Sequence, residues 1–410
     1  MSRMGADGSG DQAAAIGPAV AEATAARLAG ELPEELRPVF DAAFIRSHLL
    51  YGEFVCRLVR GILQTTGLDA LLRQPANASE LCARGDLSPS RALPPVDWML
   101  RFLAARGCLE TVDDGDAPRY RAREPWPALD PAPIRSEQLR HAPSWAPAYT
   151  VAETVAADYP AFLRGETTGE DVLFSPGRLR LWLDYFSNAN GLYLVNNVVG
   201  AAAAARWLPA DTDLAVLELG GGLASGALAL LERLESIGRL DTITDYRFTE
   251  HVAAFLRRGE RALRGRFPTW PALRCAELDM NRPFADQAVA PASVSLVYAV
   301  NTVHAARDLT FTLGEARRAL IPGGCLIVSE CVRPPVPIYA DFVFHLMEAF
   351  RAPVLHPIYR PHGGFLSPGH WRAGIEAAGF RDVRVLPDVA RIHRVVPDFG
   401  VAAIGAIRPS

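Results

Sequence analysis

The stretch VLELGGGLASG, residues 216–226, decides the fold of this 410-residue chain. The apolar run from Leu214 to Leu219 predicts a short buried strand, and the glycines after it predict a tight turn. Residues 227–234 then carry apolar side chains at helical spacing, so a helix should follow the turn. This order begins a parallel α/β unit, in which the first helix can offer free N–H groups to an anionic end of a ligand.

Strand and helix patterns alternate through the rest of the C-terminal half. We predict a helix over residues 309–320 and strands at 246–249, 294–300, 326–329, 383–386 and 401–407. Such alternation predicts a doubly wound, mostly parallel sheet. The last two strands lack a predicted helix between them, so we expect an antiparallel edge.

The N-terminal half has a different pattern. Residues 1–40 predict a flexible head followed by an alanine-rich helix. Residues 41–140 predict three helices and then a hairpin with a polar tip, which is a winged-helix-like order. Residues 141–205 predict a helical linker that roofs the pocket, and residues 206–410 the α/β domain.

Charge argues against nucleic acid as the partner of the winged block. The chain has a formal net charge of −4 and contains no lysine, and the hairpin tip carries Asp113, Asp114 and Asp116. A DNA-binding wing would need cations at that tip. We therefore expect the block to form a homodimer; a ligand-sensing regulator that binds DNA is the alternative from another functional class.

Cysteine spacing and hydropathy exclude further classes. No two of the six cysteines have the spacing of a zinc knuckle or a CxxC redox motif, so we predict no metal site. The first residues lack the apolar core of a signal peptide, and the longest apolar run, 192–208, is too short and too interrupted to span a bilayer. We expect a cytoplasmic, reduced protein with no membrane partner.

Acidic residues follow the predicted strands in an order that suits a nucleoside-containing ligand. Glu218 precedes the glycine turn and favours a cationic or donor ligand, and Glu250 can accept from both ribose hydroxyls at the end of the next strand. Asp279 can accept from an exocyclic amine, and Met280 can lie on an adenine face. Singly, each acid is more often a solvated loop residue; the ordered set is far more specific.

This set resembles the cofactor half of class I S-adenosylmethionine-dependent methyltransferases over residues 213–410. The matching stretches are 216–226, 248–250, 278–280 and 319–324, although Ala224 stands where many members have a third glycine. The resemblance implies a Rossmann-like, seven-stranded sheet and S-adenosyl-L-methionine as cofactor. It implies cofactor contacts from Glu218, Gly220, Gly222, Glu250, Asp279, Met280 and Asn301. The winged block resembles the dimerisation domain of small-molecule O-methyltransferases.

Two residues at neighbouring strand ends predict the chemistry. His304 follows the fourth predicted strand and Glu330 ends the fifth; adjacent strands lie ~4.8 Å apart, so both side chains should enter the same crevice. Glu330 can accept from one imidazole nitrogen, which leaves the other nitrogen as a base near neutral pH. The alternative interpretation is a structural histidine beside a surface acid.

The stretch from Leu278 to Glu330 resembles the C-methyltransferase domains of polyketide synthases, in which a His–Glu pair deprotonates an acidic carbon. The resemblance implies methylation of an enolisable carbon in a small metabolite or acyl thioester of bacterial specialised metabolism. Small-molecule O-methyltransferases also place a catalytic histidine at this strand end. O-methylation of a phenol, enol or hydroxy acid therefore remains the alternative.

Polar and aromatic residues on both sides of the predicted sheet are candidates for the substrate pocket. Those before the first strand are Tyr185, Tyr193 and Asn197, and those after the fifth are Met347 and Tyr359. Residues 342–347 predict a helix over the site. Taken singly, aromatic residues of the second group are more often packing than contact residues.

Overall fold

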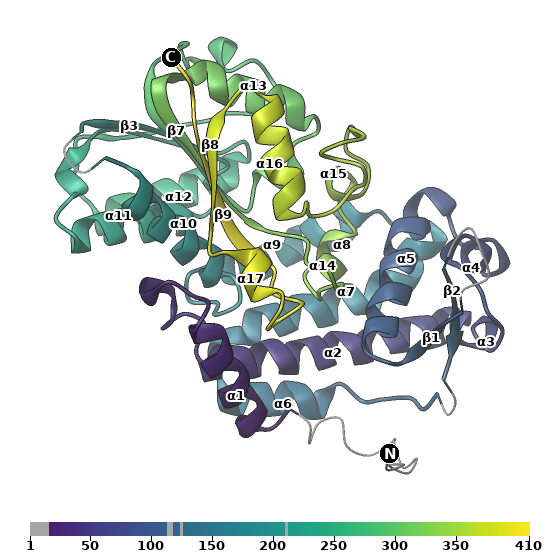
Figure 1. Ribbon diagram of the computed structural model, residues 1–410. Helices are drawn as coiled ribbons and strands as arrows, with labels where there is room; N and C mark the ends of the chain where they lie inside the picture. The colour runs from purple at the N-terminus through teal and green to yellow at the C-terminus, as the bar shows by residue number, and fades with distance from the viewer. Residues whose placement is uncertain (1–15, 113–117, 124–125, 210–211) are drawn as a thin grey trace.

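The computed structural model describes residues 16–112, 118–123, 126–209 and 212–410. Residues 1–15 of the predicted head-and-helix segment and the tip residues Asp113, Asp114 and Asp116 lie outside these ranges. A seven-stranded sheet with helices on both faces lies beside a mainly helical block that carries a two-stranded hairpin (Figure 1).

The sheet has the order β5-β4-β3-β6-β7-β9-β8. Its strands are β3 (Leu214–Leu219), β4 (Ile243–Thr249), β5 (Leu273–Ala276), β6 (Val294–Val300), β7 (Leu320–Cys331), β8 (Arg381–Leu386) and β9 (Val401–Ile407). Pairing is parallel except at β9, which runs antiparallel to both β7 and β8. The predicted parallel sheet is confirmed. A one-turn helix, α17 (Val389–Ile392), lies between the last two strands; four residues are too few to show helical spacing in a sequence.

Helices cover both faces of this sheet (Figure 1). On one side lie α10 (Leu194–Trp207), α11 (Ser225–Ser236) and α12 (Ala253–Arg266); on the other lie α13 (Leu309–Ala319) and α16 (Pro368–Ala377). The apolar residues of α11 predicted at helical spacing are buried, which explains why this segment folds onto the sheet.

The helical block begins with the 25-residue helix α2 (Ala42–Thr66). Asp41 caps its first turn by accepting from the Phe44 N–H at 2.8 Å, and Gly67 ends it with φ 72°. The block continues with α3 (Leu68–Leu71), α4 (Ala78–Arg84), α5 (Pro89–Ala105), the hairpin β1 (Leu109–Val112) and β2 (Arg119–Ala122), α6 (Ala132–His141), α7 (Ala146–Arg164), α8 (Gly169–Phe174) and α9 (Leu179–Tyr185). Within the described ranges, no helix combines the length and the apolar character needed to cross a bilayer.

The molecule has two hydrophobic cores, and each is built from segments that are not consecutive in the chain. The first unites the sheet with α10 and with α1 (Pro18–Ala29). The second unites α2 to α9 with residues 338–346, which follow β7 in the sequence. Helices α1 and α10, which precede and follow the helical block in the chain, therefore both pack in the core of the sheet. The domain limits at residues 40, 140 and 205 stay predictions.

The single helix predicted over residues 342–347 is wrong. Only its first three residues are helical, in α14 (Asp341–Phe344); a turn and an extended Met347 then separate α14 from α15 (Glu348–Arg351). Phe342 and Leu346 pack in the core of the helical block, whereas Phe344 and Phe350 lie near His304. Because the chain turns between α14 and α15, this segment contacts both the core of the helical block and the side chain of His304.

Candidate active site

His304 and Glu330 lie in direct contact at the carboxyl ends of the neighbouring strands β6 and β7. The Nδ1 atom of His304 lies 2.6 Å from Oε2 of Glu330, and the two residues are 8 % and 0 % exposed. The other carboxylate oxygen, Oε1, accepts from the backbone N–H of Val303 at 2.8 Å and from those of Thr302 and His304 at 3.3 Å. One buried carboxylate therefore holds both the turn and its imidazole ring. A proton on Nδ1 directed at Glu330 leaves Nε2 as the basic nitrogen.

Three phenylalanine rings surround the His304 imidazole. The ring centroids of Phe365, Phe350 and Phe344 lie 5.0, 6.2 and 6.4 Å from it. Apolar rings at these distances exclude water from the histidine, and a drier surrounding strengthens its charged hydrogen bond to Glu330.

Arg360 supports the same turn from the other side, and sequence reasoning missed it. Its guanidinium donates to the carbonyl oxygens of His304 at 2.8 Å and Ala306 at 2.7 Å, and the residue is 1 % exposed. Burial lowers the pKa of Arg360 to about 10. An arginine within a proline-rich loop is usually solvated, so no sequence pattern predicts this role.

The glycine turn after β3 lies next to the histidine turn. Gly220 and Gly222 both have φ 57°, a conformation that favours glycine. A Cβ at Gly220 would collide with the side chain of Thr302, whereas one at Gly222 would meet open space. Ala224 also has a positive φ, 68°, where the resembling family often has glycine. The Cα of Gly222 thus faces open space.

Glu218 is buried beneath this turn and has partners within the protein. It accepts from the Tyr246 hydroxyl at 2.9 Å and from the backbone N–H of Ala227. Burial raises the pKa of Glu218 to about 8; both hydrogen bonds oppose that rise, and the nearby Glu250 adds to it. The carboxyl is therefore largely protonated at neutral pH.

Glu250 lies against the glycine turn, as its place after β4 predicts. Its Oε2 accepts from the Gly222 N–H at 2.9 Å and its Oε1 from the Val252 N–H at 2.7 Å. Its carboxylate therefore links the glycine turn to Val252, the residue before α12.

The other predicted cofactor residues occupy the next two strand ends. Asp279 accepts from the Asn281 N–H at 2.9 Å, and Met280 packs against the edge of the first core. Asn301 adopts φ 49° after β6, and its Oδ1 accepts from the Cys331 N–H at 2.9 Å. Asparagine tolerates this left-handed conformation, so Asn301 shapes the turn that leads to His304.

Of the rim candidates, Tyr193 and Tyr185 are brought to the site. Burial raises the pKa of Tyr193, and the nearby carboxyl groups of Glu330, Glu218 and Glu250 raise it further. The Tyr185 ring lies 6.0 Å from Tyr193 and 6.4 Å from Phe344, which itself packs near His304. Ring contacts therefore run from Tyr193 through Tyr185 and Phe344 to His304.

Asn197 is fully buried in α10, four residues after Tyr193. Met347 and Tyr359 have other surroundings. Met347 packs at the edge of the second core. The Tyr359 hydroxyl lies 2.5 Å from that of Thr310 on α13, and its ring packs beside Gly374 of α16. Tyr359 is thus packed in the helical layer over the sheet, and its contact with substrate stays a prediction.

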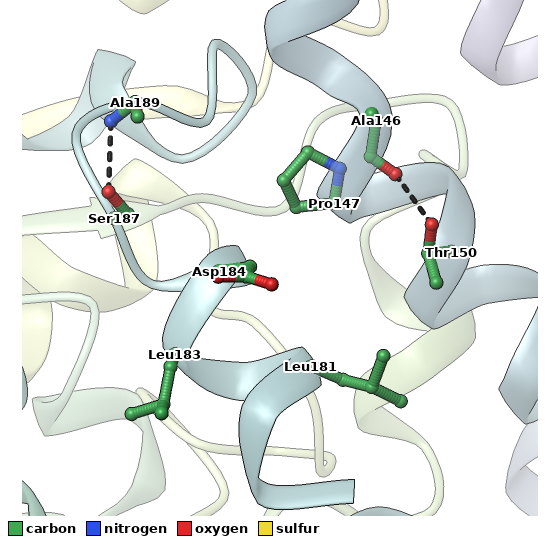
Figure 2. A pocket seen from close by; sticks show the side chains of 8 residues that line it. All are labelled: Ala146, Pro147, Thr150, Leu181, Leu183, Asp184, Ser187 and Ala189. Atoms are coloured by element: carbon green, nitrogen blue, oxygen red, sulfur yellow. Dashed lines mark hydrogen bonds between the residues drawn. The ribbon is translucent and has the colours of Figure 1, made fainter.

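A cavity of about 310 Å³ lies between α7, α9 and the turn after α9. Figure 2 shows Pro147 of α7 and Asp184 of α9 across this space, with Ser187 and Ala189 at its border. The residue between those two, Asn188, donates to the Ser225 carbonyl at 2.9 Å. The turn therefore has the cavity on one side and the start of α11 on the other.

No family model matches the chain. Among curated proteins it is 32 % identical over 186 residues to the highly reducing polyketide synthase otaA of Aspergillus carbonarius. It is 24 % identical over 245 residues to the polyketide synthase PksR of Bacillus subtilis. The matches take in 44 % and 58 % of this chain but only 7 % and 9 % of those much longer proteins.

Solved structures resemble nearly the whole chain. The CurJ carbon methyltransferase is 21 % identical with a TM-score of 0.72, covering 95 % of this chain and 99 % of that one. The DszA carbon methyltransferase is 23 % identical with a TM-score of 0.65, covering 94 % and 93 %. The trans-methyltransferase CalH, in complex with SAH, is 18 % identical with a TM-score of 0.55, covering 87 % and 89 %. These similarities show that the chain has the class I methyltransferase fold.

Proposed function

We propose that the chain is an S-adenosylmethionine-dependent carbon methyltransferase that acts on an acidic, enolisable carbon in polyketide or related specialised metabolism. The observation that carries this proposal is the buried His304–Glu330 pair beside the glycine turn of a class I methyltransferase fold. The names of the CurJ and DszA structures, both carbon methyltransferases, support carbon as the acceptor.

The residues around the glycine turn fit the cofactor. The Cα of Gly222 faces open space, Glu250 can turn its carboxylate to ribose hydroxyls, and Tyr193 lies directly before α10, near Glu250 and Glu330. Bound there, S-adenosylmethionine would supply an electrophilic methyl group. Asp279 and Met280, at the end of the neighbouring β5, would bind its adenine.

The pair supplies the base. His304 Nε2 takes the proton from the carbon between two carbonyl groups, and the Nδ1–H bond to Glu330 stabilises the imidazolium that forms. Glu330 also keeps the turn rigid through its three backbone contacts, so the ring need not reorganise during the transfer. The surrounding phenylalanine rings keep water away from the deprotonated carbon.

Oxygen methylation of a phenol, enol or hydroxy acid is the second candidate, because the same histidine can deprotonate a hydroxyl. A free or carrier-bound acyl substrate and a homodimer also stay predictions. Light scattering at micromolar concentration tests the dimer, and a monomer would remove it.

The identity of the acceptor atom decides between the two functions. We would incubate the protein with methyl-labelled S-adenosylmethionine and a panel of β-ketoacyl thioesters, keto acids and phenols, and locate the label by mass spectrometry and NMR. A C–CH₃ label on an acidic carbon supports the proposal, and an O–CH₃ label establishes the alternative. Failure to bind S-adenosylhomocysteine would overturn both.

A further inference from the structure

We propose that Cys56 and Cys108 form a reversible oxidation site, at which glutathione disulfide is reduced while the two thiols join in an intramolecular disulfide bond. The inference is independent of the proposed function. Both cysteines are free thiols, and their sulfur atoms lie 3.7 Å apart although 52 residues separate them in the chain. Among the residues that the structure describes, no other two cysteine sulfurs lie in contact.

The pair joins the middle of α2 to the turn between α5 and β1. Cys56 follows Gly52 by one helical turn, so both lie on one face of α2. That face packs on the turn, because a Cβ at Gly52 would lie 3.1 Å from the Arg106 guanidinium. The Cys108 N–H donates to the Leu103 carbonyl at 2.9 Å, which fixes the end of α5. A disulfide bond requires the sulfurs to approach by about 1.7 Å, a shift that rotation of the two side chains can supply.

The two thiols differ in access and in acidity. Cys56 is 2 % exposed, whereas Cys108 is half-buried and can be reached from solvent. The hydrogen bond that Cys56 donates is the main cause that lowers the pKa of Cys108, to about 7. Burial and the charge of Glu53 oppose this pKa shift, and the guanidinium groups of Arg60 and Arg106 add to it. Roughly half of the Cys108 thiol is therefore thiolate near pH 7, and the thiolate is the form that attacks disulfides.

These differences set the order of the reaction. The Cys108 thiolate attacks one sulfur of glutathione disulfide, and the other glutathione leaves as a thiolate. Cys56 then attacks the Cys108 sulfur, its proton passes to the second departing glutathione, and the bond between the two cysteines forms. The two protein thiols lose two electrons, and the glutathione disulfide gains them as two molecules of glutathione.

Thiol counting on the folded, full-length protein tests the inference without turnover. After incubation with glutathione disulfide, an acid quench and denaturation, we expect two of the six thiols to be lost and dithiothreitol to restore all six. Peptide mass spectrometry should find Cys56 and Cys108 in one cross-linked fragment that carries no glutathione. Six unchanged thiols, a lasting mixed disulfide at Cys108 or a bond between two chains at Cys108 would each overturn the inference.

Single substitutions separate the two steps. In Cys56→Ala, the reaction should stop at a mixed disulfide, with one thiol lost and one glutathione bound at Cys108. In Cys108→Ala, oxidation of the buried Cys56 should be at least about tenfold slower than that of Cys108 in the unaltered protein. Loss of two thiols in Cys56→Ala, or unchanged reactivity of Cys56 in Cys108→Ala, would contradict the proposed pairing.

Cys275→Ala is the matched control. Cys275 is half-buried like Cys108, but burial raises the pKa of its thiol to about 11, and no sulfur of a described residue lies against it. The Cys275→Ala variant should therefore lose the same two thiols, at the same rate, as the unaltered protein. A reaction that disappears in Cys275→Ala would place the reactive thiol elsewhere and overturn the inference.

Discussion

At the scale of single residues, Glu330 shows how one carboxylate can position both a backbone turn and a base. In Glu330→Gln, the amide oxygen can still accept from the three N–H groups, so the amide nitrogen faces His304 Nδ1. That nitrogen donates, which moves the ring proton to Nε2 and removes the base.

We therefore expect His304→Ala and Glu330→Gln each to lose roughly 10²–10⁴-fold in turnover. The double variant should be little worse, because both changes act on one step. Single-turnover transfer of a labelled methyl group measures the loss, and S-adenosylhomocysteine affinity should stay near that of the unaltered protein. Full activity in His304→Ala would refute the base assignment.

The raised pKa of Glu218 predicts how the stability of the protein depends on pH. Its pKa in the folded protein is about 8, above its usual value near 4.5, so the folded state holds the proton more tightly than the unfolded state. The associated stabilisation is complete below about pH 4.5 and is lost as the pH rises through 8. Glu218→Gln keeps a neutral side chain of the same shape and lacks this dependence.

Relative to Glu218→Gln, we expect the free energy of unfolding of the unaltered protein to fall between pH 5 and 8.5, by on the order of a few kcal/mol. Denaturant titrations without ligand across this range measure the difference. Two parallel stability curves would show that Glu218 ionises normally.

Among the structural elements, the turn after β3 packs against the turn after β6. Two glycines in the first turn allow this contact to be tested. Gly220 and Gly222 share φ 57°, so alanine at either position costs roughly 1–2 kcal/mol of backbone strain. Only at Gly220 would the new methyl group collide with Thr302.

We expect Gly220→Ala to lower the free energy of unfolding by about 1–3 kcal/mol more than Gly222→Ala does. Chemical denaturation of the two variants side by side gives the difference. Because Thr302 is two residues from His304, Gly220→Ala should also lower turnover. Equal destabilisation would mean that the two turns are not in contact.

At the scale of the whole molecule, His48 connects the helical block to the segment that precedes β9. Its Nδ1 lies 2.8 Å from the Tyr339 hydroxyl and its Nε2 lies 2.9 Å from Asp398 Oδ2. Burial alone would raise the pKa of Asp398, but the charge of His48, its hydrogen bond and Arg106 hold that pKa well below its usual range. Asp398 therefore stabilises the fold above about pH 4, and this contribution is lost as the pH falls through its folded pKa.

Asp398→Asn should lower the free energy of unfolding by about 1–3 kcal/mol at pH 7 and by less at pH 2, nearer the folded pKa. Urea unfolding at the two pH values checks this. Asp382→Asn is the matched control: Asp382 is exposed with φ 55°, which asparagine tolerates, so its effect should stay within about 0.5 kcal/mol. An equal loss at both pH values would contradict the proposed role of the charge.

The sheet could be predicted from the sequence alone, because the patterns that indicate its strands and turns each lie within a short stretch of the chain. Apolar runs bounded by glycine and proline marked β3 and β6, and the glycines at 220 and 222 marked the turn that needs positive φ. The meeting of His304 and Glu330 was also predictable, because strand order in this fold makes β6 and β7 neighbours and both residues follow carboxyl ends.

What surrounds the pair was decided only by the tertiary structure. Tyr193 and Phe344 lie near the site although about 150 residues separate them in the sequence. Tyr359 instead packs against α13 and α16. Likewise, the sulfur atoms of Cys56 and Cys108 lie 3.7 Å apart although 52 residues separate them. Sequence periodicity shows which face of an element is buried, but not which distant element covers it. Which distant element covers a face depends on the path of the long connections over the sheet. Side-chain packing between two distant segments leaves no periodic pattern in the sequence of either segment.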